Sequence, residues 1–263
     1  MEQAPKYICG GIRPWNHHGI GRIFYRQLIV PVSFKYRSEK EELLDQPDIP
    51  QQDLFRNLFE LDKINRMLGG HSATLQGLER LMTDKSKVYK IIDLGCGGGD
   101  TLLAIHRWAA VNGFKVELTG VDLLKDTIQY AAVYCADIED LELVQSDFEQ
   151  LPRWENEYDI CICSLFCHHL YGEKLEKLIK TMHRMANIGL VINDLHRHPL
   201  AYYSISILTR MLSKSVYVRN DAPLSVLRGF SKAELADLLL KCGLDQHTLE
   251  WKWAFRYLIV CHQ

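Results

Sequence analysis

Apolar residues recur every three or four positions between residues 54 and 68, and a glycine pair, Gly69-Gly70, comes directly after them. This spacing is typical of an amphipathic helix that ends at a glycine stop. Ser72 is then placed to cap a second helix, whose apolar positions extend to Met82. The pattern therefore predicts two helices between residues 50 and 82.

After Lys87 the pattern changes to short apolar runs that alternate with helical stretches. Strands are predicted at 88–95, 115–122, 141–147, 158–164 and 189–195, with helices over 100–112, 125–136 and 173–186. This alternation predicts an α/β fold with a doubly wound, mostly parallel sheet and helices on both faces. Two β-rich runs, DQHTLEWKW and AFRYLIVCH, close the chain and are expected to form an antiparallel hairpin.

The change of pattern also suggests a division of the chain. Residues 1–84 are expected to form an N-terminal arm and a helical cap, and residues 85–263 the sheet domain. Within it, residues 196–229 are interpreted as a lid insertion that begins with an amphipathic helix, LAYYSISILTRML. Tyr202, Tyr203 and Ile207 of this helix are expected to form an apolar pocket wall. Further on, Ser231 and Glu234 have the spacing of a capping box at the start of another helix.

Local pattern alone supports an interpretation of two other parts of the chain. RIFYRQLIVPVSF, residues 22–34, is aromatic and apolar but contains Pro31, which suggests a packed arm or a short strand. Asn65 and Arg66 are polar interruptions of the first predicted helix and are candidates for contact with a ligand.

Composition and charge narrow the class of protein. The formal net charge is −2 and both signs are spread along the chain, which argues against nucleic acid as a partner. No run approaches the roughly 20 apolar residues of a membrane span, and the first residues lack the apolar core of a signal peptide. These features predict a cytoplasmic protein without a membrane span, in which the eight cysteines are reduced thiols.

The segment CICSLFCHH gathers three cysteines and two histidines within nine residues, which raises the alternative of a metal site. Structural zinc sites normally use two separated ligand pairs, and no second pair is found further along. The pattern of YDICICS is instead typical of a buried parallel strand, in which cysteine acts as a small apolar residue. We therefore expect no metal.

The glycine-rich segment IIDLGCGGGD includes the end of the first predicted strand and the loop after it. A phosphate-binding loop would need Lys-Ser or Lys-Thr after the glycines, and neither is present. A dinucleotide fingerprint would place its third glycine at Asp100, whose carboxylate would oppose a pyrophosphate at the helix N-terminus. Asp122 ends the second strand, where an acidic side chain accepts hydrogen bonds from ribose hydroxyls. The loops therefore predict a cofactor that contains a nucleoside and no pyrophosphate.

Four segments in order, DLGCGGGD, VD at 121–122, SDFEQLP and YDICICSLFCHHL, resemble the successive motifs of class I S-adenosylmethionine-dependent methyltransferases. The closing hairpin also fits, since that fold carries an antiparallel seventh strand. The resemblance covers residues 85–263 and implies S-adenosylmethionine as cofactor, S-adenosylhomocysteine as product and no need for a metal. It implies that ten residues bind the cofactor: Asp93, Gly95, Cys96, Gly97, Gly99, Asp122, Leu123, Asp147, Phe148 and Ser164.

By this resemblance, Asp93 and the glycines would line the methionine half of the cofactor, and Ser164 would approach from the end of the fourth strand. Asp122 would hold the ribose and Leu123 would lie against the adenine. Asp147 and Phe148 would recognise the adenine ring.

The residues after the fourth strand bear on the identity of the methyl acceptor. Methylases of exocyclic amino groups carry an Asn/Asp-Pro-Pro-aromatic tetrapeptide there, whereas this chain has SLFC. The HHL sequence is similar to that of small-molecule methyltransferases of quinone biosynthesis. We therefore expect a small, largely apolar acceptor, O-methylation of a phenol or enol, and a histidine as the base, with His169, His168 and His196 as candidates.

Alternatives remain open at this point. One is C-methylation of a quinol-like ring, and another is a non-catalytic protein that only binds the cofactor. The sequence also leaves a homodimer open.

Overall fold

The computed structural model describes residues 32–46, 49–151 and 155–263. Contacts divide the chain into two units, Met1–Ser33 and Phe34–Gln263. Only Val32 and Ser33 of the first unit are described, and neither lies in a helix or a strand. Residues 22–31 of the expected arm lie outside the described residues.

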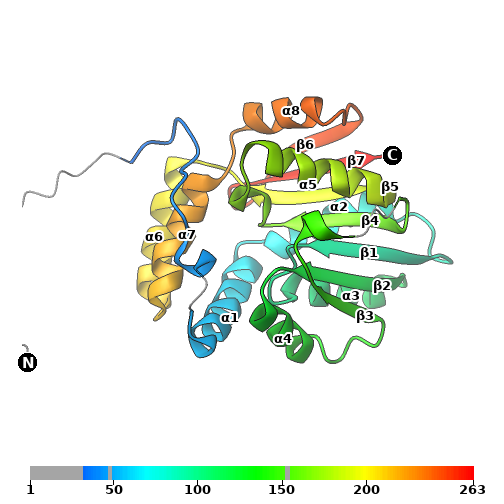
Figure 1. The fold of residues 1–263 in the computed structure, drawn as a ribbon, viewed down its shortest axis with the longest axis horizontal. Coiled ribbons are helices and arrows are strands. Elements are labelled where there is room, and N and C mark those ends of the chain that lie inside the picture. Colours follow the sequence, from blue (N-terminus) through cyan, green and yellow to red (C-terminus); the bar gives the residue numbers. More distant parts are fainter. Residues whose placement is uncertain (1–31, 47–48, 152–154) are drawn as a thin grey trace, which may run out of the picture. The chain divides into compact units, whose positions relative to one another are not determined.

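A seven-stranded sheet forms the centre of the second unit, in the order β3-β2-β1-β4-β5-β7-β6 (Figure 1). The first five strands pair in parallel, while β7 is antiparallel to both β5 and β6. The predicted fold class, including the closing hairpin, is therefore confirmed. The strands are β1 (Val88–Leu94), β2 (Lys115–Asp122), β3 (Leu141–Gln145), β4 (Tyr158–Ser164), β5 (Ala186–Leu195), β6 (His247–Lys252) and β7 (Arg256–His262).

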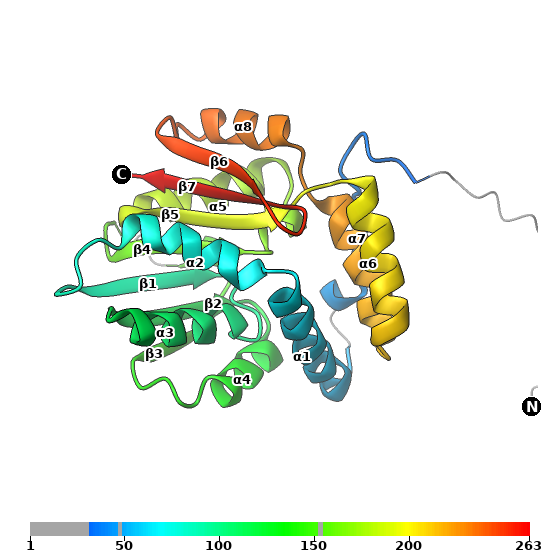
Figure 2. The same ribbon diagram turned by 180° about the vertical axis from the view of Figure 1, so that it is seen from behind.

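Helices cover both faces of this sheet. One apolar cluster contains side chains of α5 (Gly172–Met185) and α8 (Lys232–Lys241). A second cluster, on the opposite face, contains side chains of α2 (Gly70–Leu81), α3 (Asp100–Asn112) and α4 (Lys125–Tyr134) (Figure 2). None of the helices in the described ranges is both long and apolar enough to cross a membrane.

Three helices and an extended segment lie at the carboxyl ends of the parallel strands (Figures 1 and 2). The helices are α1 (Gln51–Met67), α6 (Pro199–Leu212) and α7 (Val216–Arg228). We call the antiparallel pair of α6 and α7 the lid. The segment before α1 contains a short 3-10 helix, Leu43–Asp45, whose first backbone N–H groups donate to Asp221 of α7. Two further 3-10 turns come after β3 and β4, at Phe148–Gln150 and Cys167–His169.

The corner between α1 and α2 differs from the sequence prediction. α2 begins at Gly70, and its N-cap is Gly69 in the left-handed region at φ 71°, so the expected cap at Ser72 is wrong. A side chain at Gly70 would place its Cβ 1.6 Å from Oδ1 of Asn65. The glycine pair therefore allows two helices to meet closely without an intervening loop.

Gly77 sets how closely α2 approaches the sheet. A Cβ at this position would lie 2.5 Å from Cγ1 of Val191, a buried residue of β5. We expect Gly77→Val to lower the free energy of unfolding by about 3 kcal/mol, or roughly 10 °C in melting temperature, because the overpacked helix must move from the strand. Thermal unfolding measures this. Gln76→Val introduces the same side chain at an exposed neighbouring position, and an equal loss in both variants would contradict the prediction.

Candidate functional site

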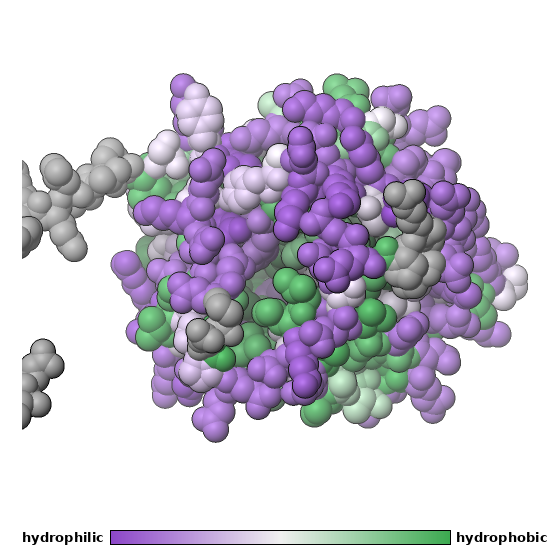
Figure 3. Space-filling model, viewed as in Figure 1, coloured by the Kyte–Doolittle hydropathy of each residue, from purple (hydrophilic) through white to green (hydrophobic). Residues whose placement is uncertain are grey.

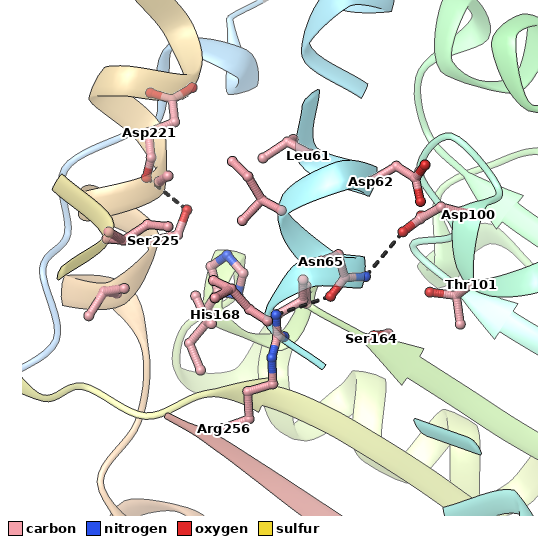
Figure 4. A pocket seen from close by; sticks show the side chains of 18 of the residues that line it. Leu61, Asp62, Asn65, Asp100, Thr101, Ser164, His168, Asp221, Ser225 and Arg256 are labelled. Carbon is pink, nitrogen blue, oxygen red and sulfur yellow. Dashed lines mark hydrogen bonds between the residues drawn. The ribbon is translucent and has the colours of Figure 1, made fainter. Parts of the chain in front are cut away.

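Two cavities of about 430 and 410 Å³ open at the carboxyl ends of the parallel strands. They meet at the loop after β1, because Gly95 and Gly97 line both of them. The larger lies between this loop, α1 and the lid, and the smaller extends towards the ends of β2 and β3 (Figure 4 shows the larger). In the space-filling view, apolar side chains gather at this hollow within a mostly polar surface (Figure 3).

Backbone hydrogen bonds fix the glycine loop against β2. The N–H groups of Gly95 and Cys96 both donate to the carbonyl of Val121, at 2.9 and 3.0 Å. Gly95 has φ 78°, and a Cβ there would lie 2.3 Å from the ring of Phe166. Only glycine satisfies both constraints, so the loop presents bare backbone to the cavities.

Asp122 connects this loop to the smaller cavity. Its Oδ2 accepts from the N–H of Gly97 and its Oδ1 accepts from the N–H of Leu124, each at 3.0 Å. Burial raises the pKa of Asp122, and the backbone hydrogen bonds offset part of that effect. Leu123, Asp147 and Phe148 line the same cavity. The sequence-predicted residues after β2 and β3 are therefore brought together.

Phe148 and Leu123 differ in burial. Phe148 is 8 % exposed and packs edge-on against Phe166, with ring centroids 6.4 Å apart. Leu123 is 60 % exposed. A ring that enters this cavity would thus meet the edge of the apolar core on one side and a solvent-facing leucine on the other.

One end of the larger cavity is formed by a buried polar group around His168. Nδ1 of His168 lies 2.8 Å from Oδ1 of Asp194, and Nε2 lies 3.8 Å from Oε1 of Glu42. Glu42 is 4 % exposed and accepts a hydrogen bond from the hydroxyl of Ser225. Burial raises the pKa of Glu42, partly offset by the charge of His169. Neither Glu42 nor Asp194 was assigned a role from the sequence.

His169 lines both cavities, and its Nδ1 lies 3.1 Å from Oδ1 of Asp45. The rings of His168 and His169 are 4.4 Å apart. Both predicted histidines therefore reach the site, and each has a carboxylate from a segment distant in the sequence beside it.

Another part of the wall of the larger cavity contains a chain of polar contacts. Nη2 of Arg256 donates to Oδ1 of Asn65 at 3.0 Å, and Nδ2 of Asn65 donates to Asp100 at 3.1 Å (Figure 4). Nε2 of His71 lies 2.7 Å from the same carboxylate. Burial would raise the pKa of Asp100, but His71 and Asn65 lower it overall. Asn65 thus contacts the site as expected, whereas Arg66 does not line either cavity.

Two predicted site residues are not brought to the cavities. Gly99 lines neither of them, and a Cβ there would lie 2.7 Å from Sγ of Cys135, so its lack of a side chain serves packing. His196 also lines neither; its ring packs 4.8 Å from that of Tyr257 and near Phe255. The remaining predicted residues line one cavity or both: Asp93, Gly95, Cys96, Gly97, Asp122, Leu123, Asp147, Phe148, Ser164, His168 and His169.

The lid helix α6 borders the larger cavity, but the prediction of which side of the helix lines it is wrong. Tyr203 and Ile207 are more than half exposed, and Tyr202 packs against Phe34. The cavity wall is formed by the opposite side of α6, through Ala201, Ser204, Ile205 and Leu208. The prediction placed the tyrosines against the cavity. In the structure, small and aliphatic residues of the helix line it instead.

The cysteines around β4 are buried in the apolar core, and Sγ of Cys163 lies 3.5 Å from Sγ of Cys167. Among the described residues, the groups whose geometry suits a metal ion are Glu42–His168–His169 and Asp62–His71–Asp100, which include no cysteine. The absence of a metal stays a prediction.

Comparisons with known proteins agree with this arrangement. Residues 91–189 match the family model described as a methyltransferase domain. A solved S-adenosylmethionine-dependent methyltransferase from Aquifex aeolicus superposes with a TM-score of 0.57 at 16 % identity, over 82 % of this chain and 99 % of that one. The chain contains a class I S-adenosylmethionine-dependent methyltransferase domain. The predicted family and enzyme class are thereby confirmed.

The names of the curated relatives of this methyltransferase domain refer to different substrates. The chain is 27 % identical over 205 residues to a tRNA N(3)-cytidine methyltransferase METTL2 of Danio rerio, covering 75 % of this chain and 56 % of the relative. It is 32 % identical over 125 residues to a ubiquinone biosynthesis O-methyltransferase of Rickettsia conorii, covering 47 % of this chain and 40 % of the relative. The chain spans about half the length of the curated relatives that it matches.

These relatives correct two expectations. Proteins named as tRNA methyltransferases match more of this chain than the quinone-pathway protein does. The expectation of a small phenol, enol or quinol-like acceptor is therefore wrong, and so is the expectation that no nucleic acid is a partner. The physical reason is that net charge and a missing tetrapeptide are weak evidence about the acceptor, since neither reports the local surface around the cavity.

The residues at the junction of the two cavities fit S-adenosylmethionine. Bare glycine backbone separates the cavities, and an acidic side chain stands at the end of β2. In the larger cavity, Oδ1 of Asp93 is buried with no hydrogen-bond partner among the described residues. An elongated molecule with a nucleoside at one end and a polar group at the other matches this donor and acceptor set.

Proposed function

We propose that the protein transfers a methyl group from S-adenosylmethionine to a nucleobase of RNA, with N3 of a tRNA cytidine as the target. The observation that carries this proposal is the similarity to tRNA N(3)-cytidine methyltransferases over three quarters of the chain. The larger cavity supports it, because a base turned out of its stack needs a closed pocket beside the cofactor.

The chemistry of cytosine N3 agrees with the residues after β4. An exocyclic amino group has its lone pair delocalised, and its N–H groups need hydrogen-bond acceptors in the site. N3 of neutral cytosine instead has an in-plane lone pair and no proton to remove. The SLFC sequence in place of an Asn-Pro-Pro-aromatic tetrapeptide is consistent with this target.

S-adenosylmethionine supplies an activated methyl group on a sulfonium. Transfer to N3 leaves a positive charge on the base, and a carboxylate nearby stabilises charge that develops in this way. We infer that Glu42 does so, because it lies in the cavity wall and its neighbours Ser225 and His168 hold it there. His168, oriented by Asp194, then acts as a positioning residue for Glu42.

Exposed cations on the elements around the cavity favour contact with an RNA backbone. They include Lys63 on α1, Arg210 on α6 and Arg219 on α7. Lysine and arginine at such positions contact phosphates and position the nucleic acid, while the pocket selects the base. The net charge of the whole chain does not reveal this local placement.

The test is methyl transfer to unmodified tRNA transcripts, with the nucleosides of the digested product separated by mass spectrometry. We expect N3-methylcytidine in the digest, and a rate that falls as salt is raised because phosphate contacts are screened. A transcript whose cytidines are replaced serves as the matched control. Methylation of another nucleoside, or of none while the cofactor binds, would contradict the proposal.

A further inference from the structure

Arg256 lies at the start of β7 with its side chain directed into the larger cavity (Figure 4). The residue is 3 % exposed. Nη2 donates to Asn65, but Nε and Nη1 have no hydrogen-bond partner among the described residues. This guanidinium thus keeps two donor groups unused inside the protein.

Such an arrangement is costly unless a ligand completes it. Burial lowers the pKa of Arg256 to about 10, so the group still carries its charge at neutral pH. A buried cation normally has an anion beside it and its N–H groups hydrogen-bonded. The charges of Asp194 and Asp100 act to raise the pKa of Arg256, but neither carboxylate accepts a hydrogen bond from Nε or Nη1. A carboxylate is the acceptor that matches a guanidinium, since its two oxygens accept parallel N–H groups.

A second unpartnered atom in the same cavity has the opposite character. Oδ1 of Asp93 is buried without a partner, and burial raises the pKa of this carboxyl. The other unpartnered buried atoms found in the described residues belong to Asn57, Arg184, Asn193 and His196, which line neither cavity. The cavity therefore presents one cationic and one acidic group, each with polar atoms that have no hydrogen-bond partner among the described residues.

The position of Arg256 is built by its neighbours. Asn65 accepts from Arg256 and donates to Asp100, which begins α3 directly after the glycine loop. A Cβ at Gly70 would lie 2.9 Å from Nη2 of Arg256, so the close approach of α2 requires glycine there. These contacts hold the guanidinium in place before any ligand binds, which lowers the entropic cost of binding.

We propose that Arg256 binds the α-carboxylate of the methionine part of the cofactor, with Asp93 as the partner of its α-ammonium group. The ligand class is thus an α-amino acid zwitterion, which brings one acceptor group and one donor group of opposite charge. The resemblance to class I methyltransferases assigned Asp93 to the methionine half but gave no role to a residue of the hairpin. This proposal concerns cofactor binding only and does not depend on the acceptor.

The test compares two ligands that share the nucleoside but differ at the amino acid. S-adenosylhomocysteine has the zwitterion, and 5′-methylthioadenosine lacks it. In titration calorimetry we expect Arg256→Gln to bind S-adenosylhomocysteine about 30-fold more weakly, because the variant loses hydrogen bonds between two charged groups. Binding of the second should be unchanged, which also shows that the variant is folded.

Arg80→Gln is the matched control, because Arg80 is an arginine of α2 that pairs with Glu250 at the surface, outside both cavities. It should bind both ligands like the wild type. Unchanged affinity of Arg256→Gln for S-adenosylhomocysteine would overturn the proposal. Equal weakening of both ligands would overturn it too.

Should Arg256→Gln fail to fold, Arg256→Lys tests the same point, because lysine keeps the charge but not the paired donors. A loss of about fivefold for S-adenosylhomocysteine alone is expected. No loss, or a loss shared by both ligands, would contradict the role of Arg256.

Discussion

Replacing Asp122 with alanine is expected to lower the affinity for S-adenosylhomocysteine by about a thousandfold, or about 4 kcal/mol. Two effects combine in this variant. The carboxylate no longer accepts from the hydroxyls of a ribose bound in the smaller cavity. The N–H groups of Gly97 and Leu124 also lose their acceptor, so the glycine loop is no longer tied to the end of β2. Titration calorimetry measures the loss.

Two variants separate the specific effect from general damage. Asp122→Asn keeps one oxygen acceptor and removes the charge, so we expect an intermediate loss. Asp137→Ala removes an exposed carboxylate beyond α4 and should bind like the wild type. Binding by Asp122→Ala within about threefold of the wild type would contradict the ribose assignment, because one charge-assisted hydrogen bond is already worth more than that.

Elements with a strong local signal were predicted to within a few residues. α3 and β2 have the predicted bounds, because Gly113 ends the helix in the left-handed region and the strand KVELTGVD begins just after the helix and its glycine stop. The capping box of Ser231 and Glu234 is present with both hydrogen bonds. In these places the conformation is determined by neighbours in the sequence.

Elements that depend on distant contacts were predicted less well. α7 was not recognised within the lid, since Pro223 lies inside it and it shows little apolar periodicity. Its position is fixed instead by contacts far along the chain, such as that of Asp221 with the backbone of Leu43 and Leu44. No local pattern carries this information.

The candidate site divides in the same way. The glycine loop, Asp122 and the residues after β3 come directly after strands, so their order in the sequence predicts their place at the sheet edge. Glu42 and Arg256 reach the cavity from the segment before α1 and from the hairpin, and Arg256 and Asn65 are 191 residues apart. A charged residue at the start of the apolar run RYLIVC is the one sequence signal that could have pointed to Arg256.

The acceptor was predicted wrongly because two arguments were extended too far. A net charge of −2 is a sum over the chain and does not report where cations stand on the surface. The missing tetrapeptide argues against an exocyclic amino group as the methylated atom. It does not argue against a ring nitrogen, which has no hydrogen for the tetrapeptide to accept. Both observations are compatible with a base of RNA as the target.

The pair of Asp194 and His168 gives the largest expected effect on stability. Asp194 is 1 % exposed and accepts from the backbone N–H groups of His168 and Leu195, while its Oδ1 lies 2.8 Å from Nδ1 of His168. Asp194→Ala leaves these groups buried without an acceptor. We expect the free energy of unfolding to fall by about 3–5 kcal/mol, and the melting temperature by roughly 10 °C or more.

The pH dependence of this loss identifies its cause. Burial alone would raise the pKa of Asp194, but His168 and the backbone hydrogen bonds lower it overall. A group with a lowered pKa in the folded state contributes stability that is present above its unfolded value, near 4, and is lost as the pH falls through the folded value. The difference between wild type and Asp194→Ala should therefore be largest near neutral pH and shrink below about pH 4.

Asp194→Asn is the matched control for shape, since it keeps one oxygen acceptor and loses the charge. We expect it to lose about half as much stability as Asp194→Ala, because removal of one partner from a buried pair costs more than the loss of its charge alone. Denaturant unfolding from pH 7 to pH 3 measures all three proteins. A difference that stays constant over this range would mean that the cavity left by the side chain, and not the ionised carboxylate, accounts for the loss.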